Sequence, residues 1–207
     1  MACYHSYTGM LAFFAVPLVM IGYSSIQKIS FQDGAVTIEK DATQLQATPT
    51  NAALLSNLAA RVASLTSRPT SDPAVLTSIA KAQFALGHAA AAESNLQKAM
   101  RTAPTLPEAV TLKQRIDNDR TLAKLTSQVA QNPHDTATKQ KLADTVAQAA
   151  SLKIANPAFL AHVASAHNLL GDRAKALEVA DTALKIDPNQ AEAKQVKNAV
   201  TGAAAHN

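Results

Sequence analysis

The residues of this chain that could do chemistry are its histidines and one run of charged side chains. His162 and His167 fall on one expected helix, where five residues of separation set them about 140° apart, so they cannot share a metal ion as an i,i+4 pair can. The charged run consists of Lys113, Arg115, Asp117, Asp119, Arg120 and Lys124. Lys113–Asp117 and Arg115–Asp119 are i,i+4 pairs, which largely neutralise each other on a helix surface. We interpret the run as a solvated face; a docking strip for an acidic partner is the alternative.

The motifs of common enzymes are missing from the sequence. Its six glycines form neither of the phosphate-binding loops GxxxxGK[ST] and GxGxxG, and the nucleophile motif GxSxG is absent as well. The single cysteine, Cys3, excludes a disulfide or a CxxC pair in the body of the chain. We therefore expect no enzymatic activity, no catalytic residue, no cofactor, no metal site and no small-molecule substrate.

The charge balance excludes one further class of partner. Residues 51–207 hold 17 Lys and Arg against 12 Asp and Glu, and the two signs are mixed along the expected helices. Nucleic-acid-binding domains instead gather their basic residues in a dense stripe. We expect protein partners and no nucleic acid.

The elements that would position a binding surface occur twice, 84 residues apart. Residues 73–107 and 157–191 align without gaps, and the small and turn-forming residues coincide. The coinciding pairs are Ala80/Ala164, Gly87/Gly171, Ala92/Ala176, Ala99/Ala183 and Pro104/Pro188. Alanine lets two helices approach closely, glycine accepts the left-handed conformation that ends a helix, and proline stops a helix from continuing. The repetition predicts stacked helical hairpins, which bind partners along a curved surface.

With these positions the chain resembles the tetratricopeptide repeat (TPR) family, in its membrane-anchored bacterial envelope form. Leu76 and Leu160 stand where that family's repeat opens with Trp. The resemblance implies an all-α, TPR-like α-solenoid whose partner lies along the first helix of each pair. The implied groove residues are Thr77, Lys81, Ala85, Ala161, Ser165 and Asn168. Only Lys81 and Asn168 match the residue types with which some members clamp a peptide carboxylate, so the small side chains favour a packed partner helix.

The N-terminal segment is apolar and precedes the first charged residue, Lys28. Residues 6–27 carry no Asp, Glu, Lys or Arg, and as a helix they would extend about 33 Å, against a hydrocarbon core of about 30 Å. This pattern predicts a single transmembrane anchor within residues 1–28, in contact with the membrane through residues 8–27. A cleaved signal peptide and a buried core helix are the alternatives. We expect the bacterial inner membrane, with the polar body in the periplasm; a body that faces the cytoplasm stays open.

Residues 29–50 are expected to join this anchor to the repeats. Ile29 and Phe31, then Val36 and Ile38, alternate at period two around Asp33-Gly34. That pattern is typical of a short β-hairpin, and an extended juxtamembrane linker is the alternative. Residues 41–50 have the composition of a linker.

The helical repeat domain is expected over residues 51–207. Asn51, Asp72 and Asn156 are suited to begin helices, and Pro73 and Pro157 fit the first helical position. Helices are predicted over residues 52–67, about 108–131, about 135–153 and about 190–201, in addition to the two repeated hairpins. Residues 107–156 lack the repeat pattern and are interpreted as an irregular helical hairpin.

Two functions fit this organisation. The first is a non-enzymatic, membrane-anchored scaffold or assembly factor that holds a membrane-associated protein in its groove. The second is a structural, non-catalytic accessory subunit of a larger inner-membrane complex.

Overall fold

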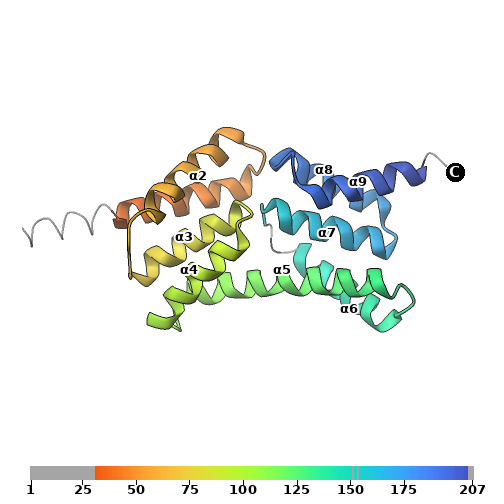
Figure 1. The fold of residues 1–207 in the computed structure, drawn as a ribbon, viewed down its shortest axis with the longest axis horizontal. Coiled ribbons are helices and arrows are strands. Elements are labelled where there is room, and N and C mark those ends of the chain that lie inside the picture. The colour runs from red at the N-terminus through yellow and green to blue at the C-terminus, as the bar shows by residue number, and fades with distance from the viewer. Residues whose placement is uncertain (1–30, 151, 153, 205–207) are drawn as a thin grey trace, which may run out of the picture.

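The computed structural model of the chain describes residues 31–150, 152 and 154–204, and every regular element within them is a helix (Figure 1). Residues 31–47 are helical and are called the 31–47 helix here. It is followed by α2 (Ala52–Thr66), α3 (Pro73–Ala85), α4 (Ala89–Thr102), α5 (Pro107–Gln131), α6 (Thr136–Ala150), α7 (Pro157–Leu170), α8 (Arg173–Ile186) and α9 (Ala191–Ala204). The predicted all-α fold is confirmed for this part of the chain.

The expected anchor, residues 1–28, lies outside the described residues. Among the helices of the described residues, none combines the length and the apolar character needed to cross a bilayer.

Side-chain caps begin the helices where the sequence predicts them. The Asn51 side chain accepts a hydrogen bond from the backbone N–H of Leu54 at 3.1 Å, and Asp72 accepts one from Ala74 at 2.9 Å. These oxygens satisfy N–H groups that have no partner within the first turn. Pro73 occupies the first position of α3, where a missing N–H costs nothing.

The two repeated glycines end the first helix of their hairpins as expected. Gly87 has φ of 85° and Gly171 has φ of 89°, in the left-handed region that side chains rarely adopt. The chain reverses at each glycine, and α3 and α7 pack against α4 and α8 respectively.

The predicted β-hairpin over residues 29–40 is wrong, because residues 31–47 form a helix. Gly34 does not serve a turn. A Cβ atom placed on it would lie 2.9 Å from Leu65 Cδ2, so the glycine allows α2 to approach this helix closely. Ala35, Ile38, Ala42 and Leu45 are buried on the same side, at the spacing of a helix that packs on one face. The helical body thus includes the segment assigned to a linker.

The 84-residue repeat extends over almost all of the described chain. The bounds of α6 lie 84 residues after those of α2, and those of α8 lie 84 residues after those of α4. The 31–47 helix corresponds in the same way to residues 115–131 of α5. Its buried positions recur there, and the pairs are Ala35/Asp119, Ile38/Leu122, Ala42/Thr126 and Leu45/Val129. We call residues 31–114 the first half and residues 115–198 the second half, and residues 84 apart are called equivalent.

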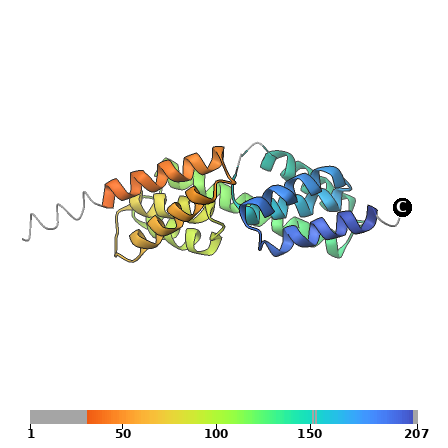
Figure 2. The same cartoon turned by 90° about the horizontal axis from the view of Figure 1, so that it is seen from above.

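The long helix α5 joins the two halves without a loop. Its first residue, Pro107, lies 84 residues before the first residue of α9. Its last residue, Gln131, lies 84 residues after the last residue of the 31–47 helix. Figures 1 and 2 show α5 running along both halves, with the 31–47 helix and α2 at one end of the molecule and α8 and α9 at the other. The two helices expected within residues 107–156 are confirmed. They pack against each other as a hairpin does, but the hairpin is not an irregular one, since its first helix is the junction of two copies.

A second contact between the halves is made by the side chain of Asn156, which lies just before the start of α7. Its side chain is fully buried. Its Nδ2 donates to the backbone oxygen of Phe84 at 2.7 Å, and its Oδ1 accepts from the N–H groups of Ala158 and Phe159 at 2.8 and 3.1 Å. One amide therefore satisfies two N–H groups at the start of α7 and gives a second donor to the Phe84 carbonyl, which also accepts from the N–H of Gly87. Ala155 beside it belongs to the core of the first half.

Candidate functional site

Helices α3 and α7 leave the same side accessible to solvent. Ser78 and Lys81 of α3 are partly exposed among buried neighbours, and so are their equivalents His162 and Ser165 of α7. Ala74 and Ala158, four residues before Ser78 and His162, complete the two faces. Residues at i, i+4 and i+7 lie on one side of a helix, so each helix presents one narrow face.

The structure separates the six predicted groove residues. Lys81 and Ser165 lie on the accessible faces. Thr77, Ala85 and Ala161 are buried, and Asn168 is half-buried. Thr77 donates its hydroxyl to the Pro73 carbonyl at 2.7 Å, and Ala161 packs in the cluster that joins α7 to α8 and α9. The face is therefore turned by one residue from the predicted one, so that Ser78 and His162 replace Thr77 and Ala161.

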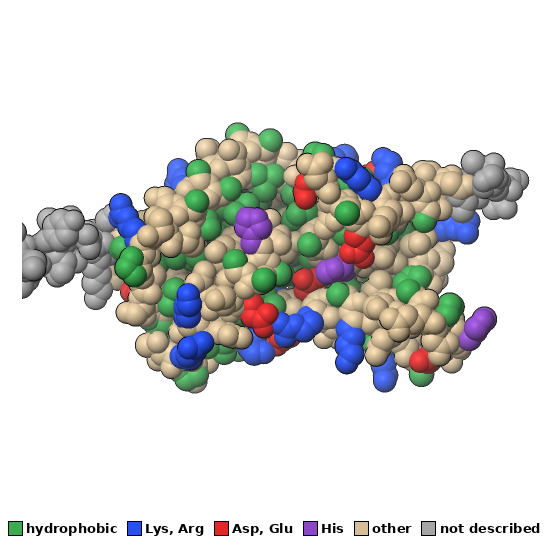
Figure 3. Space-filling view, viewed as in Figure 1, with side chains coloured by type: hydrophobic (Ala, Val, Ile, Leu, Met, Phe, Trp, Pro, Cys, Tyr) green, Lys and Arg blue, Asp and Glu red, His purple; other side chains and the backbone are tan. Residues whose placement is uncertain are grey.

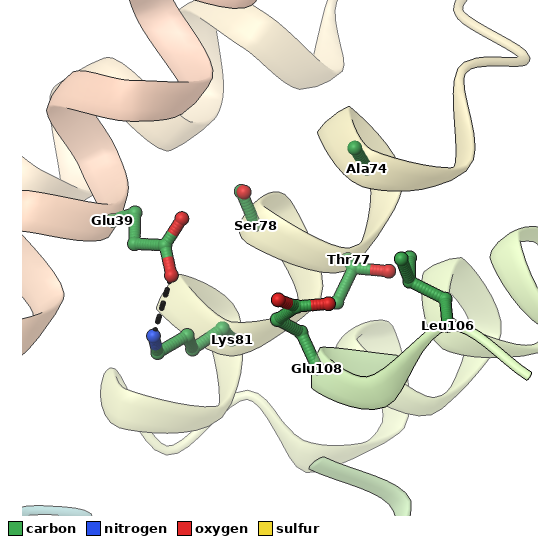
Figure 4. A pocket seen from close by; sticks show the side chains of 7 residues that line it. All are labelled: Glu39, Ala74, Thr77, Ser78, Lys81, Leu106 and Glu108. Carbon is green, nitrogen blue, oxygen red and sulfur yellow. Dashed lines mark hydrogen bonds and ion pairs between the residues drawn. The ribbon is translucent and has the colours of Figure 1, made fainter. Parts of the chain in front are cut away.

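In the first half this face opens into a pocket of about 250 Å³ between the 31–47 helix, α3 and the start of α5 (Figure 4). Lys81 Nζ donates to Glu39 Oε1 at 2.8 Å across the pocket. Glu108 contributes a second carboxylate, and Leu106 and Ala74 contribute apolar surface. The pocket is thus lined by two carboxylates and one ammonium group, of which Glu39 and Lys81 form an ion pair.

In the second half the same face carries a chain of three polar side chains. His162 Nδ1 lies 2.7 Å from Asp119 Oδ1, and His162 Nε2 lies 3.4 Å from Glu192 Oε2. The three residues come from α7, α5 and α9, and Asp119 is buried. In Figure 3 a histidine side chain lies between acidic side chains where α5 and α7 run side by side.

Opposing influences act on the pKa of His162. Burial, the largest of them, lowers it, but the hydrogen bond and charge of Asp119 and the charge of Glu192 together outweigh burial and raise the pKa above its usual value. His167 responds in the opposite direction. Burial lowers its pKa, although Asp172, whose Oδ2 lies 3.7 Å from Nδ1, opposes the change.

The pocket and the three-residue chain occupy equivalent places. Ser78 is equivalent to His162 and Glu108 is equivalent to Glu192, whereas Asp119 is replaced by Ala35 in the first half. Glu108 and Asp119 are eleven residues apart, about three turns, and so lie on one side of α5. We use the name polar row for the polar residues of the pocket and of the three-residue chain together. They are Glu39, Lys81, Glu108, Asp119, His162 and Glu192.

The charged run of α5 is only partly the self-neutralising surface that was expected. Lys113 and Asp117 form the predicted i,i+4 ion pair. The predicted Arg115–Asp119 pair is wrong, because Asp119 turns into the protein toward His162. Arg120 is paired with Glu93 of α4. The run therefore joins α5 to its neighbours at two places.

A second cleft is also repeated. One of about 540 Å³ lies between α2, α3 and α4, and one of about 220 Å³ lies between α6, α7 and α8. Six lining positions of the first, Leu76, Ile79, Gln83, Ala91, Ser94 and Asn95, are equivalent to Leu160, Val163, His167, Lys175, Glu178 and Val179 of the second. The smaller cleft is the more apolar of the two, because Ala150 and Ile154 line it where the equivalent Thr66 and Thr70 line the larger one. In the larger cleft Asn95 also donates to Gln83 Oε1 at 2.9 Å. Both clefts follow from the way each hairpin packs on the preceding helix.

No protein-family model, curated protein or solved structure matches the chain. Within the described residues, no group of three or more His, Cys, Asp or Glu side chains is placed to hold a metal ion. What bears on function is therefore found within the chain itself: two copies of one fold carry different side chains at one shared site.

Sequence reasoning missed Glu39, Glu108 and Glu192 because the alignment of the two copies was centred on their apolar and turn residues. Two signals could have found them. Glu108 and Glu192 are identical residues 84 apart, one position beyond the end of the aligned segment. Asp33, Thr37, Lys40 and Gln44 also recur, as Asp117, Thr121, Lys124 and Gln128, and would have placed Glu39 on a helix.

Proposed function

We propose that the chain is a non-enzymatic protein-interaction scaffold whose partner lies along the polar row. The observation that carries the proposal is the accessible face shared by α3 and α7, which two equivalent hairpins keep open while the positions beside it are buried. A side kept open in both copies is the natural place for an extended partner in a repeat array. The resemblance of the hairpins to TPR units supports the same surface, since that family binds along the first helices.

The chemistry of the polar row favours a polar or basic partner. Its accessible carboxylates are those of Glu39, Glu108 and Glu192, since Asp119 is buried, and they stand against Lys81 and the imidazole of His162. The chain as a whole carries a formal net charge of +4. An acidic row on a basic protein favours association with a surface of positive charge and fixes its orientation.

Position-specific crosslinking tests this surface. A photoreactive amino acid at Ala158 or Ser165, on the accessible face of α7 and outside the first-half pocket, should give crosslinks to the same partner, identified by mass spectrometry from cells that express the full chain. The same group at Ala147, exposed on α6, is the matched control and should not give that partner. A partner captured equally from all three positions would contradict binding along the polar row. A fixed stoichiometry after purification would indicate the accessory subunit instead of the assembly factor.

We propose further that residues 8–27 attach the scaffold to the bacterial inner membrane, with the body in the periplasm. The uncharged run before Lys28 supports this proposal. The full chain should remain with membranes after washing with alkaline carbonate, and Val16→Arg should impair insertion by about 2.5–3.5 kcal/mol. Mature protein that begins near Ser25 and is released by salt would show that the segment is a cleaved signal.

A further inference from the structure

The pocket of the first half lies where the second half places an imidazole. Three elements surround the pocket: the 31–47 helix, α3 and the start of α5. Their equivalents are residues 115–131 of α5, α7 and α9, and it is between these that His162 contacts Asp119 and Glu192. Ser78 has the equivalent position to His162, and its short side chain leaves the space open.

We propose that this pocket binds a flat cationic side chain of the partner protein, an imidazolium or a guanidinium, in the position equivalent to the His162 ring. The proposal rests on the proposed function, because it assigns a chemical group to the partner that lies along the polar row. The second half thus carries within its own chain the type of group that the first half takes from outside.

The lining of the pocket suits such a group. Glu108 is equivalent to Glu192, whose carboxylate faces His162 Nε2 at 3.4 Å, so Glu108 is placed to accept an N–H from a ring or guanidinium in the same position. Leu106 and Ala74 offer apolar contact to its flat side. A guanidinium or imidazolium combines these two needs, since it is planar and donates along its edge.

The charge of the pocket also favours a cation. Ala35 replaces Asp119, so the second acceptor of the His162 site is absent at its equivalent position. One turn further along the 31–47 helix, Glu39 brings a carboxylate into the pocket, where it already accepts from Lys81 at 2.8 Å. Figure 4 shows the Glu39 and Glu108 carboxylates turned toward the same space, beside Ser78 and Lys81. Two carboxylates and one ammonium leave one negative charge for an incoming group.

Small probes test the pocket without any partner. The ¹⁵N-labelled full chain is titrated with imidazole, with methylguanidinium and with pyrazole at about pH 6, where most imidazole is protonated. Pyrazole has the size and shape of imidazole but is neutral at that pH. We expect saturable shifts of the Ser78, Lys81 and Glu108 amide signals with imidazolium and methylguanidinium, and binding of pyrazole at least about tenfold weaker. Equal binding of pyrazole, or no saturable shift with either cation, would overturn the proposal.

Variants of both halves sharpen the test. Glu108→Gln keeps the shape of an exposed side chain and should weaken cation binding about tenfold. Ser78→His should abolish binding by filling the space. His162→Ser should add a second binding site, because it reproduces in the second half the space that the first half already has. Unchanged binding by Glu108→Gln, or a second site that appears with unaltered His162, would contradict the assignment.

The outcome is separable from that of the proposed function. If the probes fail to bind but the position-specific crosslinks form, the cation pocket is refuted and the proposed scaffold stands. If the probes bind but those crosslinks do not form, the proposed partner surface is refuted and the cation pocket stands.

Discussion

The two halves of this molecule have equivalent helices and share most of their buried positions, but they differ where they meet each other and where they face solvent. Asp72 and Asn156 are equivalent, and each accepts hydrogen bonds from the N–H groups two and three residues later. Only Asn156 also donates, to Phe84 of the other half. The amide of Asn156 thus caps a helix and also bonds the two halves to each other. We call this contact the joint; a carboxylate could not make it, because it has no N–H to donate.

The largest effect is expected from replacing this amide by a carboxylate. Asn156→Asp keeps the cap of α7 but loses the bond to Phe84 and places a charge in a fully buried site. We expect a loss of about 3 kcal/mol in the free energy of unfolding, measured by urea denaturation. The matched control, Asp72→Asn, should change it by less than about 0.5 kcal/mol, because both residues are good caps. Equal losses in the two variants would contradict the joint.

A smaller loss is expected where the helices of each hairpin cross. Ala92 and Ala176 are equivalent and fully buried, so Leu at either position should cost about 1–3 kcal/mol by overpacking. Ala90→Leu, exposed on α4, is the control and should be nearly neutral. An unchanged melting temperature in Ala92→Leu or Ala176→Leu would mean that the hairpins do not cross at these alanines.

The two turn glycines should behave alike. Gly87→Ala and Gly171→Ala should each destabilise by roughly 1 kcal/mol, because both residues have a positive φ. Gly202 provides a control of opposite sign, since it is helical and a Cβ atom there would contact nothing within 4 Å. Gly202→Ala should stabilise by about 0.5 kcal/mol. Thermal unfolding of the three variants side by side measures the contrast.

The smallest expected effect is a difference between the halves in how the stability of a variant depends on pH. His162 has a raised pKa in the folded chain, so its contribution to stability is fully present below the pKa of the unfolded state, about 6.5, and is lost as pH rises through the folded value. The stability difference between the natural chain and His162→Ser should therefore shrink as the pH rises from about 6 to 8. The equivalent first-half change, Ser78→Ala, should give a difference that does not vary with pH. The pH dependence that His167 contributes is the same in the natural chain and in each variant, so it does not affect these differences.

The sequence predicted most helices well because their ends are set by local chemistry. Asn51, Asp72 and Asn156 can be identified as caps without knowledge of the fold, and Gly87 and Gly171 can be identified as turns. The 31–47 helix was missed for a physical reason. Its alternation of apolar residues around Asp33-Gly34 imitates a hairpin, whereas Gly34 lies against Leu65 of α2, whose side chain an added Cβ atom would displace.

The candidate site was harder to predict because it depends on contacts between distant segments. Lys81 was identified from the repeat, but Glu39 lies 42 residues before it, in the segment expected to be extended. Asp119 has Arg115 as an attractive local partner, and the choice of His162 instead depends on which side of α5 faces α7. The accessible face of α3 and α7 was predicted one residue away from its true position, so Thr77 and Ala161 were named instead of Ser78 and His162. Small and polar residues occur on both sides of these helices, so the sequence does not clearly show which side is buried.

The loop-free junction in α5 also makes the architecture open to growth. Residue 199 is equivalent to residue 115, so a further copy of residues 115–198 inserted after residue 198 would continue α9 as the natural chain continues α5. Each added copy would bring its own polar site, separated from the last by one more fused helix. The reach of the binding surface is then a matter of copy number, which duplication of a single coding segment can change in one step.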